Sequence, residues 1–381
     1  MVLASELNWL HVHALDRRSG ELQLTCSIEL PEQVQYAVAD ARSRFLYVSA
    51  SNGRTSHWLY ALAIDPESGA LREHGAPLAP PAGRIIHLSI DTAGGYLILA
   101  HNQTSQISTV RLAAGGTLAE FVTQHGSTRT GFYTHQALLD EERAGLVACG
   151  LGAPASDTAP EQPGSLTVFA YAAGVLSQTQ RLFLGPGLGA RHLDYSGGRV
   201  FVAAERGNRL FVYNYVDGVL APEPSFAVST LLDPDAVRPG QRVGAIHVHP
   251  SGKYLYLSNR ARETIRSEVG GRPVDVFAGG ENDITLYEID RNSGAPQLIE
   301  RYETRGFEAR TFSIDPAGQF LFVGNQSTRN VLHADGAVEP VARNVAVFRI
   351  GHEARLRYLH KYDFSGGELF WLGAIALPPR L

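Results

Sequence analysis

Four charged or titratable side chains stand at the ends of short strand-like runs, where a binding site can be built. His135 opens the run HQALLD, Arg191 opens RHLDYS, Glu205 ends RVFVAAE and Arg260 ends YLYLSNR. Arginine binds carboxylate and phosphate groups through two parallel hydrogen bonds and stays charged. Histidine exchanges a proton near neutral pH, and glutamate either exchanges a proton or holds an arginine in place. These residue types together predict a site that binds a small anion and moves a proton.

The positions of these residues follow from a repeat that extends along the whole chain. Its unit is an apolar run, a turn rich in Asp, Pro, Gly or Ser, and a second apolar run; most copies continue with an alternating strand, a turn and a further strand. The second runs are FLYVSAS, YLILAHN, GLVACGL, RVFVAAE, YLYLSNR and FLFVGNQ. A spacing of about 50 residues holds about four antiparallel strands per unit, and no segment of helical periodicity interrupts them.

This repeat predicts an all-β fold, namely a seven-bladed β-propeller of four-stranded antiparallel blades. Six units are complete, and the ends of the chain supply the seventh. ELFWLGAIAL resembles a first strand without its partner, while MVLASE resembles a second strand without its predecessor. Joining the N- and C-terminal strands in one blade removes the open edge that a linear array would expose. We therefore expect a single domain over residues 1–381, with a closing blade formed by about 1–30 and about 365–381.

The same topology brings the candidate site residues to one end of the ring. Within each blade, the start of the first strand and the end of the second strand lie at the same mouth. The first strands begin with Gln35, Ile86, His135, Arg191, Ala245 and Arg310, and the second strands end with Ser51, Asn102, Leu151, Glu205, Arg260 and Gln326. Adjacent blades thus bring four of these residues into one sector near the axis, namely His135, Arg191, Glu205 and Arg260. Four long segments also fall at this mouth, and we expect irregular binding loops over 153–164, 230–243, 261–282 and 327–343.

The composition excludes several classes of partner. The chain has 381 residues, is 44% hydrophobic and carries a net charge of -5, so neither a nucleic acid nor an anionic membrane surface is an expected partner.

Cys26 and Cys149 have no paired spacing, which argues against a disulfide framework and fits a reducing compartment. The first residues lack a basic start followed by a long apolar run, and no later segment is apolar over a length that spans a bilayer. We therefore expect a cytoplasmic protein, of an oligomeric state that the sequence does not indicate.

No metal or cofactor is expected. His11 and His13 lie two apart on a strand, as do His247 and His249, but no cysteine or acidic cluster completes a metal site around either pair. An alternative cation site, of the kind found in calcium-dependent gluconolactonase propellers, would take oxygen ligands near the axis from Asn102, Glu205, Asn259 and Asn325.

At the candidate site residues, the sequence resembles the lactonase family of seven-bladed propellers, which includes bacterial 6-phosphogluconolactonases and fungal 3-carboxy-cis,cis-muconate lactonizing enzymes. The resemblance covers essentially the whole chain and is clearest in GARHLDYSGGRVFVAAERGNRLFVY and AIHVHPSGKYLYLSNRARETI. It implies functional roles for His135, Arg191, Glu205 and Arg260. One departure concerns the third blade, where Gly150 stands in place of the Asp of the family's Asp-Leu-Gly triplet.

From these residues and the resemblance we expect His135 and Glu205 to be catalytic, and Arg191, Arg260 and Arg310 to bind substrate. In an intracellular lactonase that hydrolyses a small anionic sugar-acid or phosphosugar lactone, His135 would take a proton from the attacking water. In a cycloisomerase of the 3-carboxymuconate type, the substrate's own carboxylate attacks its double bond while the enzyme clamps the carboxylates and delivers a proton. The sequence leaves both reactions open, and it equally allows Glu205 to orient its neighbours or to pair with Arg191. A non-catalytic scaffold for protein partners is a third reading, favoured by the long mouth segments.

Overall fold

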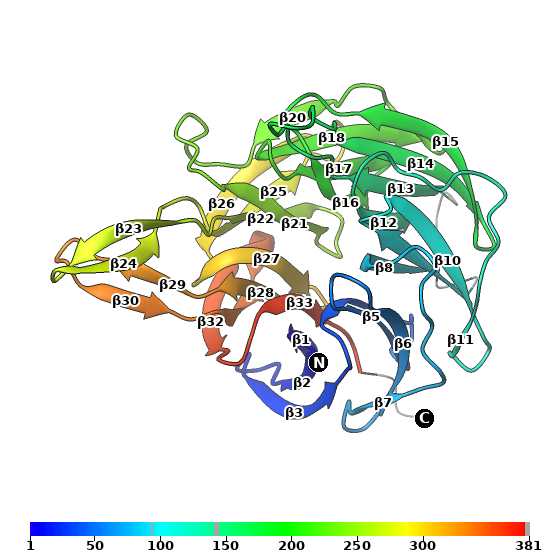
Figure 1. Cartoon of the computed structure of the whole chain (residues 1–381), viewed down its shortest axis with the longest axis horizontal. Helices are drawn as coiled ribbons and strands as arrows, with labels where there is room; N and C mark the ends of the chain where they lie inside the picture. The colour runs from blue at the N-terminus through cyan, green and yellow to red at the C-terminus, as the bar shows by residue number, and fades with distance from the viewer. Residues whose placement is uncertain (92, 94, 141–144, 378–381) are drawn as a thin grey trace.

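Seven four-stranded antiparallel sheets are arranged in a ring in the computed structural model, which describes residues 1–91, 93, 95–140 and 145–377 (Figure 1). The innermost strands of the sheets pack against one another in order around a central axis. This arrangement is a seven-bladed β-propeller, so the predicted fold class is confirmed. In the part of the chain that the structure describes, the only helical element is a 3-10 turn over His352–Ala354.

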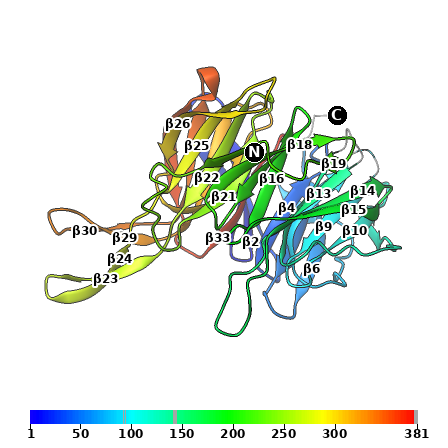
Figure 2. The ribbon, with the colours of Figure 1, turned by 90° about the horizontal axis from the view of Figure 1, so that it is seen from above.

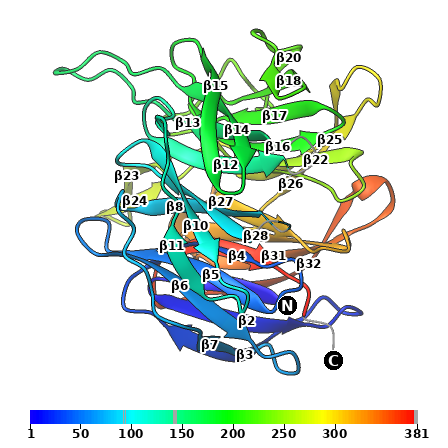
Figure 3. The same ribbon diagram turned by 90° about the vertical axis from the view of Figure 1, so that its right-hand side faces the viewer.

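Three sheets follow the N-terminal strands, each running from the axis outward. They are β4 (Val34–Ala39), β5 (Phe45–Ser51), β6 (His57–Ile64) and β7 (Leu71–Glu73); β8 (Ile85–Asp91), β9 (Tyr96–His101), β10 (Gln106–Leu112) and β11 (Leu118–Phe121); and β12 (Thr134–Asp140), β13 (Gly145–Gly150), β14 (Ser165–Ala172) and β15 (Val175–Phe183). Figure 3 shows these three sheets in succession, with β12–β15 above β8–β11 and β4–β7. Two of the predicted turns, at 91–95 and 140–145, lie partly outside the described residues.

Three further sheets lie between the β12–β15 sheet and the sheet that closes the ring. They are β16 (Ala190–Ser196), β17 (Arg199–Ala204), β18 (Arg209–Val216) and β20 (Phe226–Ser229); β21 (Arg242–Val248), β22 (Tyr254–Arg260), β25 (Asp283–Ile289) and β26 (Pro296–Glu303); and β27 (Phe307–Ile314), β28 (Phe320–Ser327), β31 (Asn344–Ile350) and β32 (Leu356–Asp363). A short strand, β19 (Val219–Leu220), also pairs with β18. The second strands, such as β17 and β22, are almost wholly buried, whereas outer strands such as β26 are exposed or only partly buried, so the core lies between the blades near the axis.

The closing sheet joins the two ends of the chain. Its inner strand is β33 (Leu369–Ala374), which pairs antiparallel with β1 (Val2–Glu6), and β2 (Trp9–Leu15) and β3 (Leu22–Glu29) follow outward. In addition, the amino group of Met1 donates a hydrogen bond to the carbonyl of Ile375 at 2.8 Å. Closure by the terminal strands, as predicted, is confirmed, although residues 378–381 of the expected closing blade lie outside the described part of the chain.

Deletion of residues 1–8 is expected to lower the melting temperature by more than about 10 °C, because it removes β1 from between β33 and β2. The deletion removes the buried side chains of Val2, Leu3 and Ala4, exposes core residues that pack against them, such as Trp371 and Leu372, and leaves two strand edges unpaired. Thermal unfolding followed by circular dichroism measures the effect. A melting temperature equal to that of the full chain would show that β1 does not hold the ring closed.

Short turns at the end of the ring opposite the long segments share one hydrogen-bond pattern. In DRRSG, DPESG and DRNSG, one carboxylate oxygen of the aspartate accepts hydrogen bonds from the backbone N–H groups two and three residues later. The glycines that end these turns have φ between 74° and 84°, a conformation that glycine adopts without strain. Because these turns are alike, variation between blades is concentrated at the other end, the mouth.

Two of the four long mouth segments are ordered hairpins, so the prediction of irregular loops is wrong for them. Segment 261–282 contains β23 (Thr264–Val269) and β24 (Arg272–Phe277), and segment 327–343 contains β29 (Arg329–Leu332) and β30 (Val338–Val341). The hairpins pack together through β24 and β29 and project to the same side of the ring (Figures 1 and 2). Most residues of these strands are exposed or only partly buried, with Val276 as a buried exception, so the apolar alternation by which half-buried strands are recognised in a sequence is weak.

Candidate active site at the propeller mouth

A polar cavity of about 250 Å³ lies at the mouth of the propeller. Six arginines and two glutamates contribute to its wall, namely Arg84, Arg191, Arg242, Arg260, Arg262, Arg310, Glu205 and Glu308. His135, Tyr133, Asn102 and Phe370 also line it. All five residues that the sequence singled out, His135, Arg191, Glu205, Arg260 and Arg310, therefore face one cavity.

The blade geometry explains how residues so distant in sequence meet. His135 and Arg191 are each the second residue of an inner strand, β12 and β16, whereas Glu205 directly follows β17 and Arg260 ends β22. Arg310 is the fourth residue of β27, because that strand begins earlier than the repeat predicts. Strand starts and strand ends thus converge at one rim.

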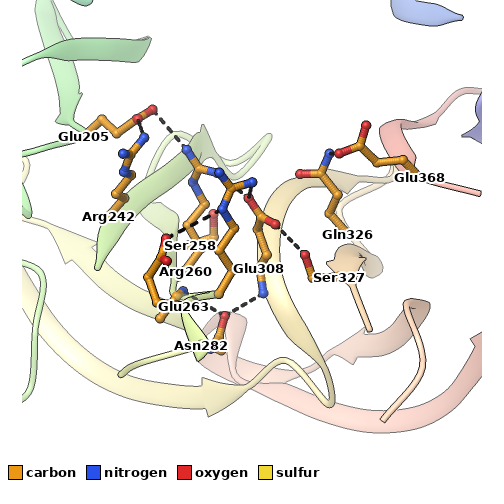
Figure 4. A network of polar contacts seen from close by, with 12 residues as sticks. Glu205, Arg242, Ser258, Arg260, Glu263, Asn282, Glu308, Gln326, Ser327 and Glu368 are labelled. Carbon is orange, nitrogen blue, oxygen red and sulfur yellow. Dashed lines mark hydrogen bonds and ion pairs between the residues drawn. The ribbon is translucent and has the colours of Figure 1, made fainter. Parts of the chain in front are cut away.

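Glu205 is the centre of a buried ion-pair network (Figure 4). One of its carboxylate oxygens accepts a hydrogen bond from Arg191 at 2.5 Å and forms an ion pair with Arg260 at 3.2 Å, and the other accepts from Arg242 at 3.0 Å. Its side chain is only 2% exposed. Burial alone would raise the pKa of Glu205, but the three guanidinium groups outweigh burial and hold this pKa well below its usual range. Glu205 is therefore ionised at neutral pH.

Glu308 is a second buried carboxylate at the site, and the strand repeat did not predict it. It accepts hydrogen bonds from Arg260 at 3.1 Å, from Arg262 at 3.3 Å and from the hydroxyl of Ser327 at 2.6 Å (Figure 4). Its backbone has a φ of 58°, and its N–H donates to the side-chain carbonyl of Asn282 at 2.8 Å. This left-handed residue precedes the irregular pairing of β27 with β28, which lies between Ala309 and Thr311, and Glu308 is outside the strand-start positions that the repeat aligns.

Arg310 differs from the other arginines of the cavity in its surroundings. Its guanidinium lies 4.0 Å from the centre of the Phe370 ring, and among the described residues no carboxylate is within ion-pair distance of it. Arg84, whose guanidinium lies 5.8 Å from the centre of the same ring, donates instead to the side-chain carbonyl of Gln35. Burial and the charges of Arg191 and Arg260 lower the pKa of Arg310, but a guanidinium stays protonated at neutral pH, so Arg310 presents a positive charge to a cavity that it lines.

His135 is a buried imidazole that stays neutral at physiological pH. Its Nδ1 atom has no hydrogen-bond partner among the residues that the structure covers, and its ring contacts that of His192 with centroids 5.0 Å apart. Burial, followed by the charges of Arg191, Arg310 and Arg260, holds the pKa of His135 well below its usual range. The ring is therefore unprotonated at neutral pH, although the same burial and charges make it a weak base.

The atoms around Gly150 leave no room for the aspartate that the family's Asp-Leu-Gly triplet has at this position. A Cβ atom at this position would lie 2.4 Å from the hydroxyl of Ser165 and 3.1 Å from the carbonyl of Thr130. In two other blades an asparagine side chain donates a hydrogen bond to the equivalent backbone carbonyl. Asn259 donates to the carbonyl of Thr230 at 2.7 Å, and Asn325 donates to that of Thr304 at 2.7 Å. Here the Ser165 hydroxyl donates to the Thr130 carbonyl at 2.6 Å and performs the same task.

Replacing Gly150 by asparagine is therefore expected to lower the free energy of unfolding by about 2 kcal/mol, through overpacking against Ser165. The double variant Gly150→Asn/Ser165→Gly should recover most of this loss, since the space is freed and the amide can donate to Thr130. Urea unfolding of both variants measures the effect. A single variant as stable as the parent chain would refute the steric explanation.

The alternative cation site is not assembled among the described residues. Asn259 and Asn325 direct their amides to backbone carbonyls within the sheets and do not line the cavity, so only Asn102 and Glu205 of the predicted set face it. No group of three or more histidine, cysteine, aspartate or glutamate side chains within the described ranges is placed to hold a metal ion.

The fold and the site together define a propeller with a cationic cavity at its mouth, built around a neutral histidine. The family described as Lactonase, 7-bladed beta-propeller, matches residues 5–347, and the chain belongs to this family of enzymes. Its relatives include proteins named 6-phosphogluconolactonase from Formosa agariphila, 26% identical over 85% of this chain and 87% of the relative, and from Bacillus subtilis, 24% identical over 65% and 64%.

Solved structures with the same fold are more distant in sequence. A periplasmic gluconolactonase of Pseudomonas aeruginosa has a TM-score of 0.73 at 20% identity and covers 99% of both chains. A protein from Lactobacillus plantarum has a TM-score of 0.73 at 20% identity, covering 97% of this chain and 98% of its own. At this level of identity, the likeness establishes the fold.

Proposed function

We propose that this protein hydrolyses a small anionic lactone, of the sugar-acid or phosphosugar type, in the mouth cavity. One observation carries the proposal: a neutral imidazole, His135, and a guanidinium with no carboxylate partner among the described residues, Arg310, face the same cavity. The names of the relatives support lactone hydrolysis, and the surplus of arginine over glutamate in the wall supports an anionic substrate.

In the proposed reaction, His135 takes a proton from a water molecule as its oxygen bonds to the lactone carbonyl carbon. The negative charge that develops on the carbonyl oxygen is stabilised by guanidinium N–H groups, for which Arg191 and Arg260 are placed at the cavity wall. The bond between that carbon and the ring oxygen then breaks. The released alkoxide takes the proton back from His135, leaving the open-chain acid.

Within this scheme Glu205 acts by position and not by proton transfer. Its carboxylate is held ionised by three arginines, which removes it as an acid at neutral pH and weakens it as a base. Glu205 and Glu308 together fix the directions of Arg191, Arg242, Arg260 and Arg262. The arginine N–H groups that remain free for substrate are thereby pre-oriented.

The experiment that tests the proposal measures acid release from 6-phosphogluconolactone in a pH-stat, above the spontaneous rate, and separately follows the absorbance of 3-carboxymuconate. Acid release without loss of muconate supports the proposal. Loss of muconate alone would assign the protein as a cycloisomerase. No turnover of either compound would contradict the proposal and favour a binding scaffold, a role to which the projecting hairpins are suited.

The place of the reaction is proposed to be the cytoplasm. Cys26 and Cys149 are both free thiols, which fits a reducing compartment. In the described part of the chain, no helix has the length and apolarity needed to cross a membrane. Cell fractionation with an antibody against the protein tests this placement.

A further inference from the structure

The charges of the mouth cavity are compensated unequally. Arg191, Arg242, Arg260 and Arg262 each form an ion pair with Glu205 or Glu308 at 3.3 Å or less. Arg310 has the Phe370 ring on one side and no such partner within the described residues. A guanidinium removed from bulk water without a counter-ion is costly, and the cost is offset when an anion binds. Arg84 also has no ion pair within the described residues, but its guanidinium donates to the side-chain carbonyl of Gln35. Arg310 is therefore the position in the wall where an added negative charge is most favoured.

The same charge acts on His135. The groups that act on its ring come from β8, β16, β22 and β27, and they are His87, Arg191, His192, Arg260 and Arg310. Both carboxylates of the cavity, Glu205 and Glu308, are already engaged by arginines. Of the three cations that oppose a proton on His135, Arg310 alone has no paired carboxylate. Its neutralisation is thus the change that most favours the imidazolium.

Resting on the proposed lactonase function, we propose that Arg310 is a subsite for an anionic group of the substrate remote from the lactone carbonyl, and that its occupation switches on His135 as a base. The ligand class is an oxyanion, either a phosphate dianion or a carboxylate. With the subsite empty, a proton taken from water would reside on an imidazole facing three arginines. With an oxyanion bound, the nearest uncompensated charge is neutralised, and the imidazolium formed during the reaction is stabilised.

This coupling predicts selectivity by activation as well as by affinity. A neutral lactone can enter the cavity, but it meets a histidine that accepts a proton poorly. An anionic lactone itself supplies the oxyanion that occupies the Arg310 subsite and makes His135 a stronger base. Binding energy at a remote group is then expressed in kcat and not only in KM, which is how an enzyme uses contacts away from the reacting atoms.

The test separates the activator from the substrate. Hydrolysis of neutral glucono-δ-lactone by the full chain is measured with increasing inorganic phosphite, against sodium chloride of equal ionic strength, and with acetate as the carboxylate probe. Phosphite is expected to raise kcat/KM at least tenfold and saturably. Arg310→Gln should abolish the increase, Arg310→Lys should retain part of it, and Arg111→Gln, in an exposed ion pair on an outer strand, should retain all of it.

A second measurement does not depend on turnover. Proton NMR titration of the His135 ring, assigned by its absence in His135→Gln, should show its pKa rising toward the usual range when phosphite is added, and not rising in Arg310→Gln. If phosphite neither accelerates the hydrolysis of glucono-δ-lactone nor raises the pKa of His135, the subsite proposal is overturned, while the lactonase proposal still stands. A phosphite-dependent rise without turnover of any lactone would support the subsite and contradict the lactonase.

Discussion

Replacing His135 by glutamine is expected to lower kcat/KM for the lactone by about 10²–10⁴-fold, the usual contribution of a positioned base, and to leave the fold intact. Glutamine has a similar size and polarity but accepts no proton at neutral pH. His135 makes no hydrogen bond to another described residue through its buried Nδ1, so the exchange breaks no such bond there. Acid release in a pH-stat gives the rate, and thermal unfolding by circular dichroism gives the stability. His352→Gln, at a side chain that is 92% exposed, is the matched control and should keep full activity.

The pH dependence of the native enzyme provides an independent test of the same assignment. A base is active when deprotonated, so activity falls as the pH drops through its pKa. Burial and the arginines hold the pKa of His135 low in the free protein, which places the acidic limb of kcat/KM well below pH 6.5. Under the subsite proposal, the limb of kcat for an anionic lactone lies at higher pH. Substantial activity in His135→Gln, or an acidic limb at or above pH 6.5 in kcat/KM, would refute His135 as the base.

The repeat made the fold predictable from the sequence alone. Turn residues and apolar runs recur at a spacing that lengthens only later in the chain. The unmatched fragments at the chain ends, MVLASE and ELFWLGAIAL, contain β1 and β33, which pair with each other. The convergence of His135, Arg191, Glu205, Arg260 and Arg310 followed from the same geometry, because equivalent positions in adjacent blades lie at one rim.

The remaining parts of the site depend on features that the repeat does not encode. Glu308 lines the cavity from a left-handed backbone conformation just before an irregularity of β27, and no spacing rule aligns it with another blade. Phe370 reaches Arg310 only through the register of β33 in the closing sheet, which two distant segments set together. Arg242 is the first residue of β21, and its pairing with Glu205 requires the ring to bring neighbouring blades together. Such contacts arise from tertiary packing, which local sequence patterns do not reveal.

Replacing Glu205 by glutamine is expected to lower the free energy of unfolding by about 3–5 kcal/mol at pH 7, the cost of leaving buried charges uncompensated. Arg191 and Arg260, both buried, share one oxygen of this carboxylate, and neither retains that ion pair when the charge is removed. Urea unfolding at pH 7 measures the loss. The matched control is Glu120→Gln, whose side chain is 64% exposed and pairs with Arg111 at the surface; it should cost less than about 1 kcal/mol.

The difference between the native chain and Glu205→Gln should itself depend on pH, with a defined sign. The folded-state pKa of Glu205 lies below that of an unfolded chain, which is about 4.3. Its contribution to stability is therefore complete above that value and is lost as the pH falls toward the folded-state pKa. The gap in unfolding free energy should be constant from pH 8 to about 5 and narrow at pH 3.5. If instead the variant loses activity while unfolding like the native chain at pH 7, Glu205 takes part in proton transfer, and its assignment as the residue that positions the arginines is wrong.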